Sequence, residues 1–472
     1  MNGGGRGEDW RDAVLAGFDL PAPKAGGRNP LGWPGYHPRQ SVRCGTGRIG
    51  TARVVAAVWD FSVFGGTFGE READAFAAGC AQAVQEGLPL VTFVRTGGTR
   101  LQEGMAALVG IPRAALALEE VAAAGLPHLS VVDHPTTGGI WIAVCGEADL
   151  RVAVAGATVG FSGPRVIEAM TGEPLPAGSH TAEGAYAAGL VDAVAPGPQV
   201  GSWLCRALSA LAPPGNGRVE PTAEVEAPDR DGWAQVAAAR AERPSGADLL
   251  SAALDGPVEL RGSDPTVRAV VGRSAADRPT VGVALAAGRG ERPGPAGFRL
   301  LTRAARTADR LGADLLTFVD TPGADPTAPS EAGGLAPAIG EALTAVLRCR
   351  SASLAVVHGE GGSGGALAAA TTDTVLVTPT GYFAALGPEG AGSALKLPTA
   401  EAAARMGVRP ADLDALGFAT PVDGNPATLR ATVAARLRDL GDTPQRARLA
   451  ARRARWAAPL PGTLPRNSDG TA

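Results

Sequence analysis

The stretch "LVTFVRTGG" (90–98) decides the fold, because a similar stretch occurs a second time in the chain. Its second copy is "LLTFVDTPG" (315–323), which begins 225 positions later (90 to 315). The similarity continues downstream, where "LSVVDHPTTGG" (129–139) pairs with "LAVVHGEGGSGG" (354–365), again 225 positions apart (129 to 354). Agreement of both spacing and residue type indicates a duplicated domain.

Two further pairs extend the repeat with a shift of one residue. Asp149 pairs with Asp373, and the Gly-Pro at 163–164 pairs with the Gly-Pro at 387–388, both 224 positions apart (149 to 373 and 163 to 387). Such a small slippage is typical of short insertions or deletions in the loops of a duplicated domain.

Each half alternates short β-branched runs with alanine-rich runs. In the first half the expected order of strand, helix, strand, helix and strand is 53–61, 70–87, 88–94, 110–126 and 127–132. Strands that are apolar on both faces and alternate with helices are typical of parallel βαβ units. We therefore expect an α/β fold in each half.

The stretch "LAPPGNGRVEPTAEVEAPDRDG" (211–232) is rich in proline, glycine and acidic residues and predicts a linker. We expect one domain over 1–222, ending in this linker, and a second over 223–472.

Composition narrows the class of protein. The 472 residues are 45% hydrophobic and 19% charged, with a net charge of −4 and no basic block, which argues against binding to nucleic acid or to a membrane surface. No run approaches the roughly 20 apolar residues of a membrane span, and "MNGGGRGEDWRDAV" (1–14) lacks the apolar core of a signal peptide. We expect a cytoplasmic protein.

The five cysteines are widely spaced without a C-x-x-C pair, which argues against both a zinc site and a disulfide framework: Cys44, Cys80, Cys145, Cys205 and Cys349.

Both halves place a Gly-Gly pair between a strand and a helix, in "TTGGIWIAV" (136–144) and "GSGGALAAA" (362–370). The first N–H groups of a helix lack intrahelical acceptors, and glycine lets a substrate oxygen approach them. Two such N–H groups can form an oxyanion hole that stabilises an enolate. The alternative is that the glycines only allow close helix–strand packing.

Two other interpretations of the second glycine loop, a phosphate-binding P-loop and a serine hydrolase, are excluded because the residues they require are absent. A P-loop requires Lys-Ser/Thr after the glycines, and none follows. Ser363 stands in a G-x-S-x-G pattern, but the chain has no histidine after His358 to serve as its base.

Several extended motifs resemble one family, the acetyl-CoA carboxylase carboxyltransferase. The first half resembles its β chain in "NPLGWPGY" (29–36), "DFSVFGGTFGE" (60–70), "TGGTRLQEG" (96–104), "HPTTGG" (134–139) and "GFSGPRVIE" (160–168). From about 233 onward the second half resembles the α chain in "PGPAGFRLLTRAA" (293–305), "FVDTPGADP" (318–326), "GEGGSGGALA" (359–368) and "GPEGAGSALK" (387–396). The resemblance implies a β–α fusion of two tandem crotonase-like ββα-superhelix domains.

The resemblance also implies a reaction: carboxyl transfer from carboxybiotin to a short acyl-CoA, with acetyl-CoA giving malonyl-CoA. It assigns Gly138 and Gly139 to the hole for the thioester enolate, and Gly365 and Ala366 to the hole for the ureido oxygen of carboxybiotin. The further glycines and the arginine of these motifs are candidate substrate contacts: Gly65, Gly66, Gly97, Gly98, Arg100, Gly362 and Gly364. For "TGGTR" (96–100), a turn followed by a surface arginine is an equally good reading.

The resemblance further implies partners. Neither Lys24 nor Lys396 lies in a Met-Lys-Met context, so biotin would come on a separate biotin carboxyl carrier protein, charged by a biotin carboxylase. The chain is expected to form a homodimer or a larger homo-oligomer, because such domains typically build each site between two chains.

Some residues depart from the family pattern. Bacterial β chains begin with a four-cysteine zinc ribbon, whereas only Cys44 precedes the core, so no metal is expected. His134 stands where the family has aspartate, and His358 replaces an apolar residue, which makes both possible proton donors. The segment "EAGG" (331–334) lacks the arginine of the family's Glu-Glu-Arg-Gly. Two alternatives therefore stay open: a biotin-independent decarboxylase of malonyl-CoA or a malonyl thioester, and a non-catalytic scaffold subunit.

Overall fold

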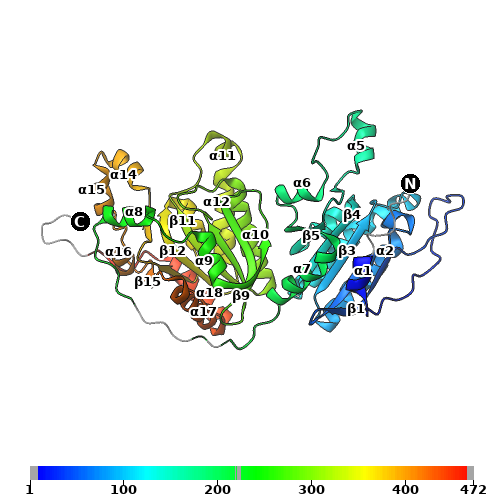
Figure 1. Cartoon of the computed structure of the whole chain (residues 1–472), viewed down its shortest axis with the longest axis horizontal. Helices are drawn as coiled ribbons and strands as arrows, with labels where there is room; N and C mark the ends of the chain where they lie inside the picture. The colour runs from blue at the N-terminus through cyan, green and yellow to red at the C-terminus, as the bar shows by residue number, and fades with distance from the viewer. Residues whose placement is uncertain (1–8, 218, 220–224, 465–472) are drawn as a thin grey trace. The chain divides into compact units, whose positions relative to one another are not determined.

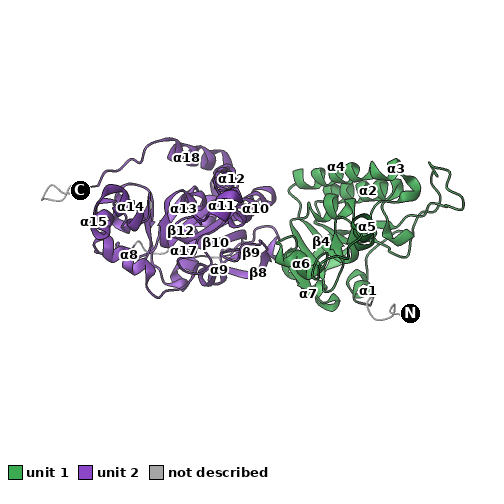
Figure 2. Cartoon of the chain, turned by 90° about the horizontal axis from the view of Figure 1, so that it is seen from above, with its two compact units in different colours: residues 1–209 green, residues 210–472 purple. Residues whose placement is uncertain are grey.

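A computed structural model of the chain describes residues 9–217, 219 and 225–464. The chain folds into two compact units, Met1–Ser209 and Ala210–Ala472 (Figure 1 and Figure 2). The domain boundary expected between 222 and 223 lies outside the described residues and stays a prediction.

Unit 1 is built on a seven-stranded sheet with the order β1-β2-β3-β4-β5-β7, and β6 also pairs with β4. The strands β1 and β2 are antiparallel, and the remaining pairs are parallel. The strands are β1 (Val42–Ile49), β2 (Ala52–Trp59), β3 (Leu90–Thr96), β4 (His128–Thr137), β5 (Leu150–Val154), β6 (Val159–Gly160) and β7 (Ala193–Ala195).

The helices of unit 1 connect these strands. They are α1 (Asp9–Leu15), η1 (Phe64–Gly66), α2 (Glu70–Glu86), η2 (Leu101–Glu103), α3 (Met105–Leu108), α4 (Gly110–Ala123), η3 (Trp141–Cys145), α5 (Pro164–Thr171), α6 (Ala182–Ala187) and α7 (Gly197–Ala210). Helices α2 and α4 pack side by side (Figure 2). The side chains of Trp59, Phe68 and Phe76 pack together in the core, with ring centroids 6.3 Å apart for Trp59 and Phe68.

Unit 2 has an eight-stranded sheet with the order β15-β13-β12-β11-β10-β9-β8, and β14 also pairs with β12. Its strands are β8 (Leu254–Leu260), β9 (Val267–Ser274), β10 (Pro279–Leu285), β11 (Asp314–Thr321), β12 (Ser353–Gly362), β13 (Thr374–Val377), β14 (Tyr382–Ala384) and β15 (Thr420–Pro421). Its helices are α8 (Gly232–Arg240), α9 (Gly246–Ala253), α10 (Pro295–Leu311), α11 (Ala328–Ala332), α12 (Leu335–Arg348), α13 (Ser363–Ala370), α14 (Pro388–Leu395), α15 (Thr399–Arg405), α16 (Pro410–Ala415), α17 (Pro426–Asp442) and α18 (Gln445–Ala457).

The two units repeat each other in detail, as the sequence predicts. The register between the two central strands shifts at the same point in both sheets, just before Thr96 in unit 1 and just before Thr321 in unit 2. The paired aspartates also act alike: Asp149 accepts a hydrogen bond from the backbone N–H of His128 (2.8 Å), and Asp373 from that of Ser353 (2.9 Å). The predicted duplication is confirmed at the level of single contacts.

One predicted element differs between the units. The sequence predicts a helix directly after each Gly-Gly pair; the second pair, Gly364-Gly365, lies in the first turn of α13 itself. After the first pair the chain forms the wider π-helical turn η3, closed by the Gly146 N–H bonding to the Trp141 carbonyl (2.8 Å). The bulky side chains of "IWI" (140–142) stand at the start of this turn, where α13 has "ALAAA" (366–370). Single π-helical turns of this kind are frequent at functional sites.

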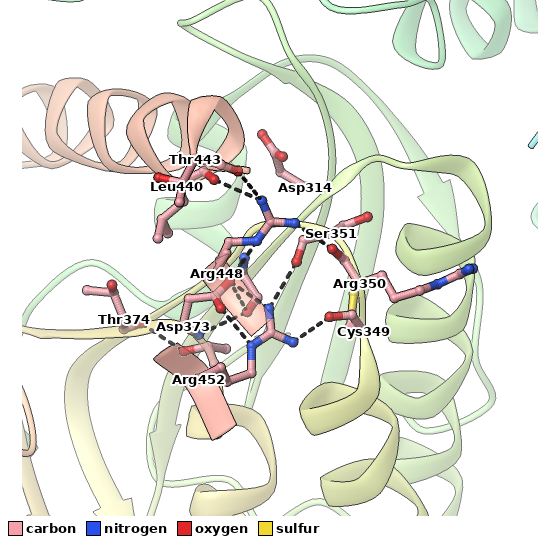
Figure 3. A network of polar contacts seen from close by, with 12 residues as sticks. Asp314, Cys349, Arg350, Ser351, Asp373, Thr374, Leu440, Thr443, Arg448 and Arg452 are labelled. Atoms are coloured by element: carbon pink, nitrogen blue, oxygen red, sulfur yellow. Dashed lines mark hydrogen bonds and ion pairs between the residues drawn. The ribbon is translucent and has the colours of Figure 1, made fainter. Parts of the chain in front are cut away.

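Two arginines of α18 close unit 2 at the amino ends of its strands (Figure 3). Arg452 donates to both carboxylate oxygens of Asp373, at 2.7 and 2.6 Å, and to the Ser351 carbonyl at 3.0 Å. Arg448 donates to the Leu440 carbonyl at 2.9 Å. Both arginine side chains are buried, and Arg448 Nε also lies 3.6 Å from an Asp373 carboxylate oxygen, so the two arginines together balance the charge of Asp373, with Arg452 the closer.

Replacing Arg452 should therefore destabilise unit 2. Arg452→Ala removes the closer of the two arginines that pair with the buried Asp373 carboxylate and leaves only the longer contact to Arg448, so we expect a loss of about 3 kcal/mol in the free energy of unfolding, measured by urea denaturation of the whole chain. Arg453→Ala, at the exposed neighbouring position of α18, is the matched control and should change stability by less than about 0.5 kcal/mol. Equal effects of the two substitutions would contradict this account.

Among the described residues, no helix is long and apolar enough to cross a membrane.

Candidate functional site

The two glycine turns of unit 1 touch each other. Gly98 follows β3 with φ +106°, and Gly138 follows β4 with φ +77°. A Cβ added to Gly138 would lie 2.8 Å from the Gly98 Cα, closer than real Cβ contacts allow. Both positions therefore need glycine, because the backbone is left-handed and the two turns meet without side chains between them.

Unit 2 repeats this arrangement at the ends of β11 and β12. Gly323 has φ +138°, and a Cβ added to Gly362 would overlap the Pro322 carbonyl. A threonine fixes the first turn in both units: the Thr321 hydroxyl accepts the Gly323 N–H at 3.2 Å, as the Thr96 hydroxyl accepts the Gly98 N–H at 3.0 Å. Each unit thus carries one candidate site of the same construction.

Some of the predicted site glycines of unit 1 have free N–H groups, and others use their N–H groups within the chain. The Gly138 N–H donates to the Phe161 carbonyl (2.8 Å), and the Gly97 N–H donates to the Gly65 carbonyl (2.9 Å). The Gly139 N–H has no acceptor within the described chain. The expectation that Gly138 donates to substrate is corrected, because its N–H already holds the turn.

Two other predicted glycines support this turn. The Gly66 N–H is used by the Val63 carbonyl (3.0 Å), and the left-handed backbone of Gly65 and Gly66 brings η1 against the end of β3. These two glycines shape the site, and the Gly66 N–H is not free to bind a ligand.

In unit 2 the free donors lie at the start of α13, whose N-cap is Gly362. In an α-helix the N–H of the fourth residue after the N-cap bonds back to the N-cap carbonyl, so the Ala366 N–H is the first that is used within the helix. The N–H groups of Gly364 and Gly365 precede it and have no acceptor among the described residues. A Cβ on Gly364 would meet nothing within 4 Å, so that side of the helix start is open.

Sequence reasoning missed one residue in each unit. Thr99 and Ala324 immediately follow the two turns, are partly exposed, and have N–H groups without acceptors in the described structure. The Ala324 nitrogen lies 2.9 Å from the position that a Cβ on Gly365 would occupy. The two turns of unit 2 therefore bring the N–H groups of Ala324 and Gly365 close together. The repeat contained the signal, because 99 and 324 are equivalent at the offset of 225 (324 − 99).

Arg100 is not placed as a ligand contact. Its side chain is completely buried, and its guanidinium pairs with Glu72 (3.0 Å) and donates to the Thr67 carbonyl (2.6 Å). The guanidinium also lies over the Phe64 ring, 5.0 Å from its centroid. Both readings of Arg100, as a substrate contact and as a surface arginine, are corrected: it joins η1 to α2 in the core.

His134 is the more accessible of the two candidate proton donors. It is exposed, and its Nδ1 accepts the Thr158 N–H at 3.1 Å, which leaves the proton of the neutral ring on Nε2. Arg95 donates to its carbonyl at 2.6 Å, so the backbone here is held in place.

His358 is almost fully buried in β12. Burial lowers its pKa from the ordinary 6.5 to about 4; the nearby Arg243 lowers it further, whereas Asp320 opposes the shift. Its Nδ1 lies 3.3 Å from an Arg243 nitrogen, and its Nε2 has no partner among the described residues. The expectation that His358 donates a proton stays a prediction, and the burial of its ring argues against it.

A buried ionic network fixes the strand ends beneath the candidate site of unit 2. Arg243 pairs with Asp320 at 2.6 Å, and the Asp320 carboxylate accepts the Glu360 N–H at 3.0 Å. The Glu360 carboxylate in turn accepts the Tyr382 hydroxyl (2.7 Å) and Arg240 Nε (3.0 Å). These contacts tie β11, β12 and β14 together and hold the two turns in register.

The buried His358 predicts how stability depends on pH. Because its folded pKa of about 4 lies below the ordinary 6.5, the unfolded chain takes up a proton first as the pH falls. The neutral histidine contributes its full stability above about pH 6.5, and this contribution is lost as the pH falls to about 4, on the order of 3 kcal/mol. His358→Gln should remove this part of the slope in urea denaturation between pH 7 and 4. Parallel slopes for the variant and the wild type would contradict the burial argument.

No group of three or more His, Cys, Asp or Glu side chains in the described ranges is placed to hold a metal ion.

Comparison with known proteins identifies the family. Residues 231–428 match the family described as acetyl co-enzyme A carboxylase carboxyltransferase-like. A protein of Salinispora tropica named "Acetyl-coenzyme A carboxylase carboxyl transferase subunits beta/alpha" is 35% identical over 428 residues, covering 82% of this chain and 74% of that protein. The chain belongs to the acetyl-CoA carboxylase carboxyltransferase family. It is a carboxyltransferase, and the expected family is confirmed.

Other relatives and solved structures extend the comparison. A "probable biotin-dependent acyl-coenzyme A carboxylase beta3 subunit" of Mycobacterium bovis is 34% identical over 384 residues, covering 79% of this chain and 78% of that protein. A transcarboxylase 12S structure with methylmalonyl-CoA and methylmalonic acid bound superposes with a TM-score of 0.75 at 22% identity, covering 92% of this chain and 89% of that chain. At this identity the match shows the fold alone, and the expected tandem crotonase-like fold is confirmed.

Proposed function

We propose that the protein moves a carboxyl group from carboxybiotin, borne by a separate carrier protein, to a short acyl-CoA, with acetyl-CoA giving malonyl-CoA. The observation that carries this proposal is the pair of equivalent turns, each with N–H groups that no described residue accepts. The assignment of unit 1 to the acyl-CoA and unit 2 to biotin follows the β-type and α-type motifs of the two halves.

In unit 1, the Gly139 and Thr99 N–H groups are the proposed donors to the thioester oxygen. Charge develops on this oxygen when the acyl group becomes an enolate, and donors already fixed in place stabilise it without reorganisation. Gly98 and Gly138 leave no side chain in the way, and Arg100 holds the turn from the core.

In unit 2, the Gly364, Gly365 and Ala324 N–H groups are the proposed donors to the ureido oxygen of biotin. The open space at Gly364 fits the approach of a planar ring with an acceptor oxygen. Biotin supplies an activated carboxyl group, and this chain's residues position it and withdraw charge from the ureido oxygen.

A second candidate function rests on His134. Its exposed ring can donate a proton from Nε2, so the enolate left after loss of CO₂ from a malonyl thioester could be protonated at this site. This reaction would need no biotin carrier.

The two functions separate in one assay of the purified chain. With a carboxylated biotin carrier and acetyl-CoA we expect malonyl-CoA to accumulate, and without the carrier no reaction. Release of CO₂ from malonyl-CoA without any carrier would overturn carboxyl transfer in favour of decarboxylation. In that case His134→Gln should lower the rate.

Glycine variants test the donors themselves. Gly365→Ala places a methyl group 2.9 Å from the Ala324 nitrogen and should lower kcat for carboxyl transfer at least about 100-fold, because one donor turn must move. Gly340→Ala is the control: it lies in α12, its Cβ meets nothing within 4 Å, and activity should be unchanged. Calorimetric binding of CoA should survive Gly365→Ala; its loss would indicate general misfolding.

We further propose that the active enzyme is a homo-oligomer in which unit 1 of one copy meets unit 2 of another. Helix α5 buries none of its residues, and large apolar side chains are exposed on it and near the first turn, including Met170 (81%) and Leu101 (78%). Its counterpart α14 buries Ala391 and Gly392 and packs on α15. A second copy would give α5 the cover that α14 has within the chain.

Mixing two inactive variants tests this assembly. In a C₂ dimer with sites shared between copies, Gly139→Val and Gly365→Val chains form mixed dimers with one doubly damaged site and one intact site. Random exchange makes about half of the dimers mixed, so about a quarter of wild-type activity should return. No recovery, with exchange shown by differently tagged chains, would reject shared sites.

A further inference from the structure

A pocket of about 550 Å³ opens in unit 1, and none of its lining residues belongs to the candidate site. It lies between the strap formed by residues 21–28, the edge strand β1, and the helices α2 and α4 (α2 and α4 in Figure 2). Its charged lining consists of Lys24, Arg28, Glu70, Arg71, Asp74 and Arg113. A volume of this size is typical of small-molecule sites.

The pocket carries excess positive charge at two fixed points. Arg28 pairs with Glu70, and Arg113 pairs with Asp74, so these four charges balance. Lys24 and Arg71 line the same pocket and have no acidic partner among the described residues. Two cations without counter-charges at one cavity favour an anion carrying about two negative charges.

Arg71 lies in the pocket wall with one guanidinium nitrogen that makes no hydrogen bond. Its Nε is buried and has no acceptor in the described structure. Gly27, with φ +146°, passes over it, and a Cβ there would lie 2.7 Å from this Nε. Because the strap covers this nitrogen, a ligand in the pocket would contact the terminal guanidinium nitrogens of Arg71, which are not among the buried atoms without a partner.

Backbone hydrogen bonds hold the strap that carries Lys24. The Lys24 N–H donates to the Gln40 side-chain oxygen (3.2 Å), and the Gln40 N–H returns a bond to the Lys24 carbonyl (3.2 Å). The Gly26 N–H donates to the Pro38 carbonyl (3.1 Å). The backbone at Lys24 is thus held at the rim, and its side chain is exposed.

The floor of the pocket is uncharged. Ala75, Ala78 and Gly79 line it from one face of α2, and the Cys44 thiol completes it, with burial raising the pKa of that thiol to about 12. A thiol with this pKa is neutral at physiological pH. The floor therefore suits an uncharged, partly apolar body next to the charged end.

From these observations we propose that the pocket binds an organic phosphate: a phosphate monoester, held by Arg71 and Lys24, on an uncharged body about the size of a nucleoside. This ligand chemistry has two sources. It is either the 3′-phosphate end of a CoA substrate or a separate nucleotide. The inference goes beyond the proposed reaction, because binding here does not depend on carboxyl transfer.

Calorimetry on the whole chain at low salt tests the site. AMP is the probe, and inorganic phosphate, which lacks the nucleoside, is the comparison ligand. We expect saturable AMP binding that is tighter than phosphate binding. Arg71→Gln and Lys24→Gln should each weaken AMP binding at least about tenfold, because each removes a charge-assisted contact. Arg53→Gln, which removes one positive charge at a surface pair with Glu86 elsewhere in unit 1, should leave it unchanged.

Competition identifies the source of the phosphate. If CoA displaces AMP and dephospho-CoA does not, the pocket holds the 3′-phosphate of the substrate; if AMP and CoA bind together, it holds a separate nucleotide. No saturable AMP binding, or equal binding by wild type and both pocket variants, would overturn the proposal. Lys24 lies on the exposed strap, so Lys24→Gln keeps the test valid even if Arg71→Gln fails to fold. Failure of the carboxyl-transfer assay would leave these binding results unaffected.

Discussion

The close approach of two bare backbone turns is the constraint on which each unit depends. Gly98 meets Gly138 in unit 1, and Gly323 meets Gly362 in unit 2. No side chain fits between these turns, so the ends of two parallel strands can lie side by side and present N–H groups at one edge. The shift in register before Thr96 and Thr321 is the local adjustment that lets the strands end in this way.

The same turns are supported differently in the two units. In unit 2 a buried carboxylate, Asp320, links Arg243 to the backbone of β12. In unit 1 the equivalent position is Arg95, which reaches the His134 carbonyl from an exposed setting. The duplicated backbone is thus retained while the charges beneath it differ, and His134 is exposed whereas His358 is buried.

Much of this arrangement could be predicted from the sequence, because it depends on local patterns. The repeat, the βαβ order and the two glycine turns follow from residue type and spacing alone. The free N–H groups could not be predicted, because whether Gly138 or Gly139 is free depends on Phe161, which the fold brings back from a later strand end. The burial of Arg100 and of His358 was equally hidden, because periodicity gives the face of an element and not the depth or the partners of one polar side chain.

The link between Arg452 and Asp373 also sets an order of events during synthesis. The two residues are 79 positions apart in the chain. While the ribosome is still making that stretch, the Asp373 carboxylate has no arginine from α18, so the amino ends of the unit 2 strands stay open to water. Unit 1 needs nothing from α18 for its own sheet and can finish folding earlier, as leading domains commonly do. The second unit therefore cannot complete this ion pair until α18 has been made, whereas all strands of the first unit's sheet are made long before.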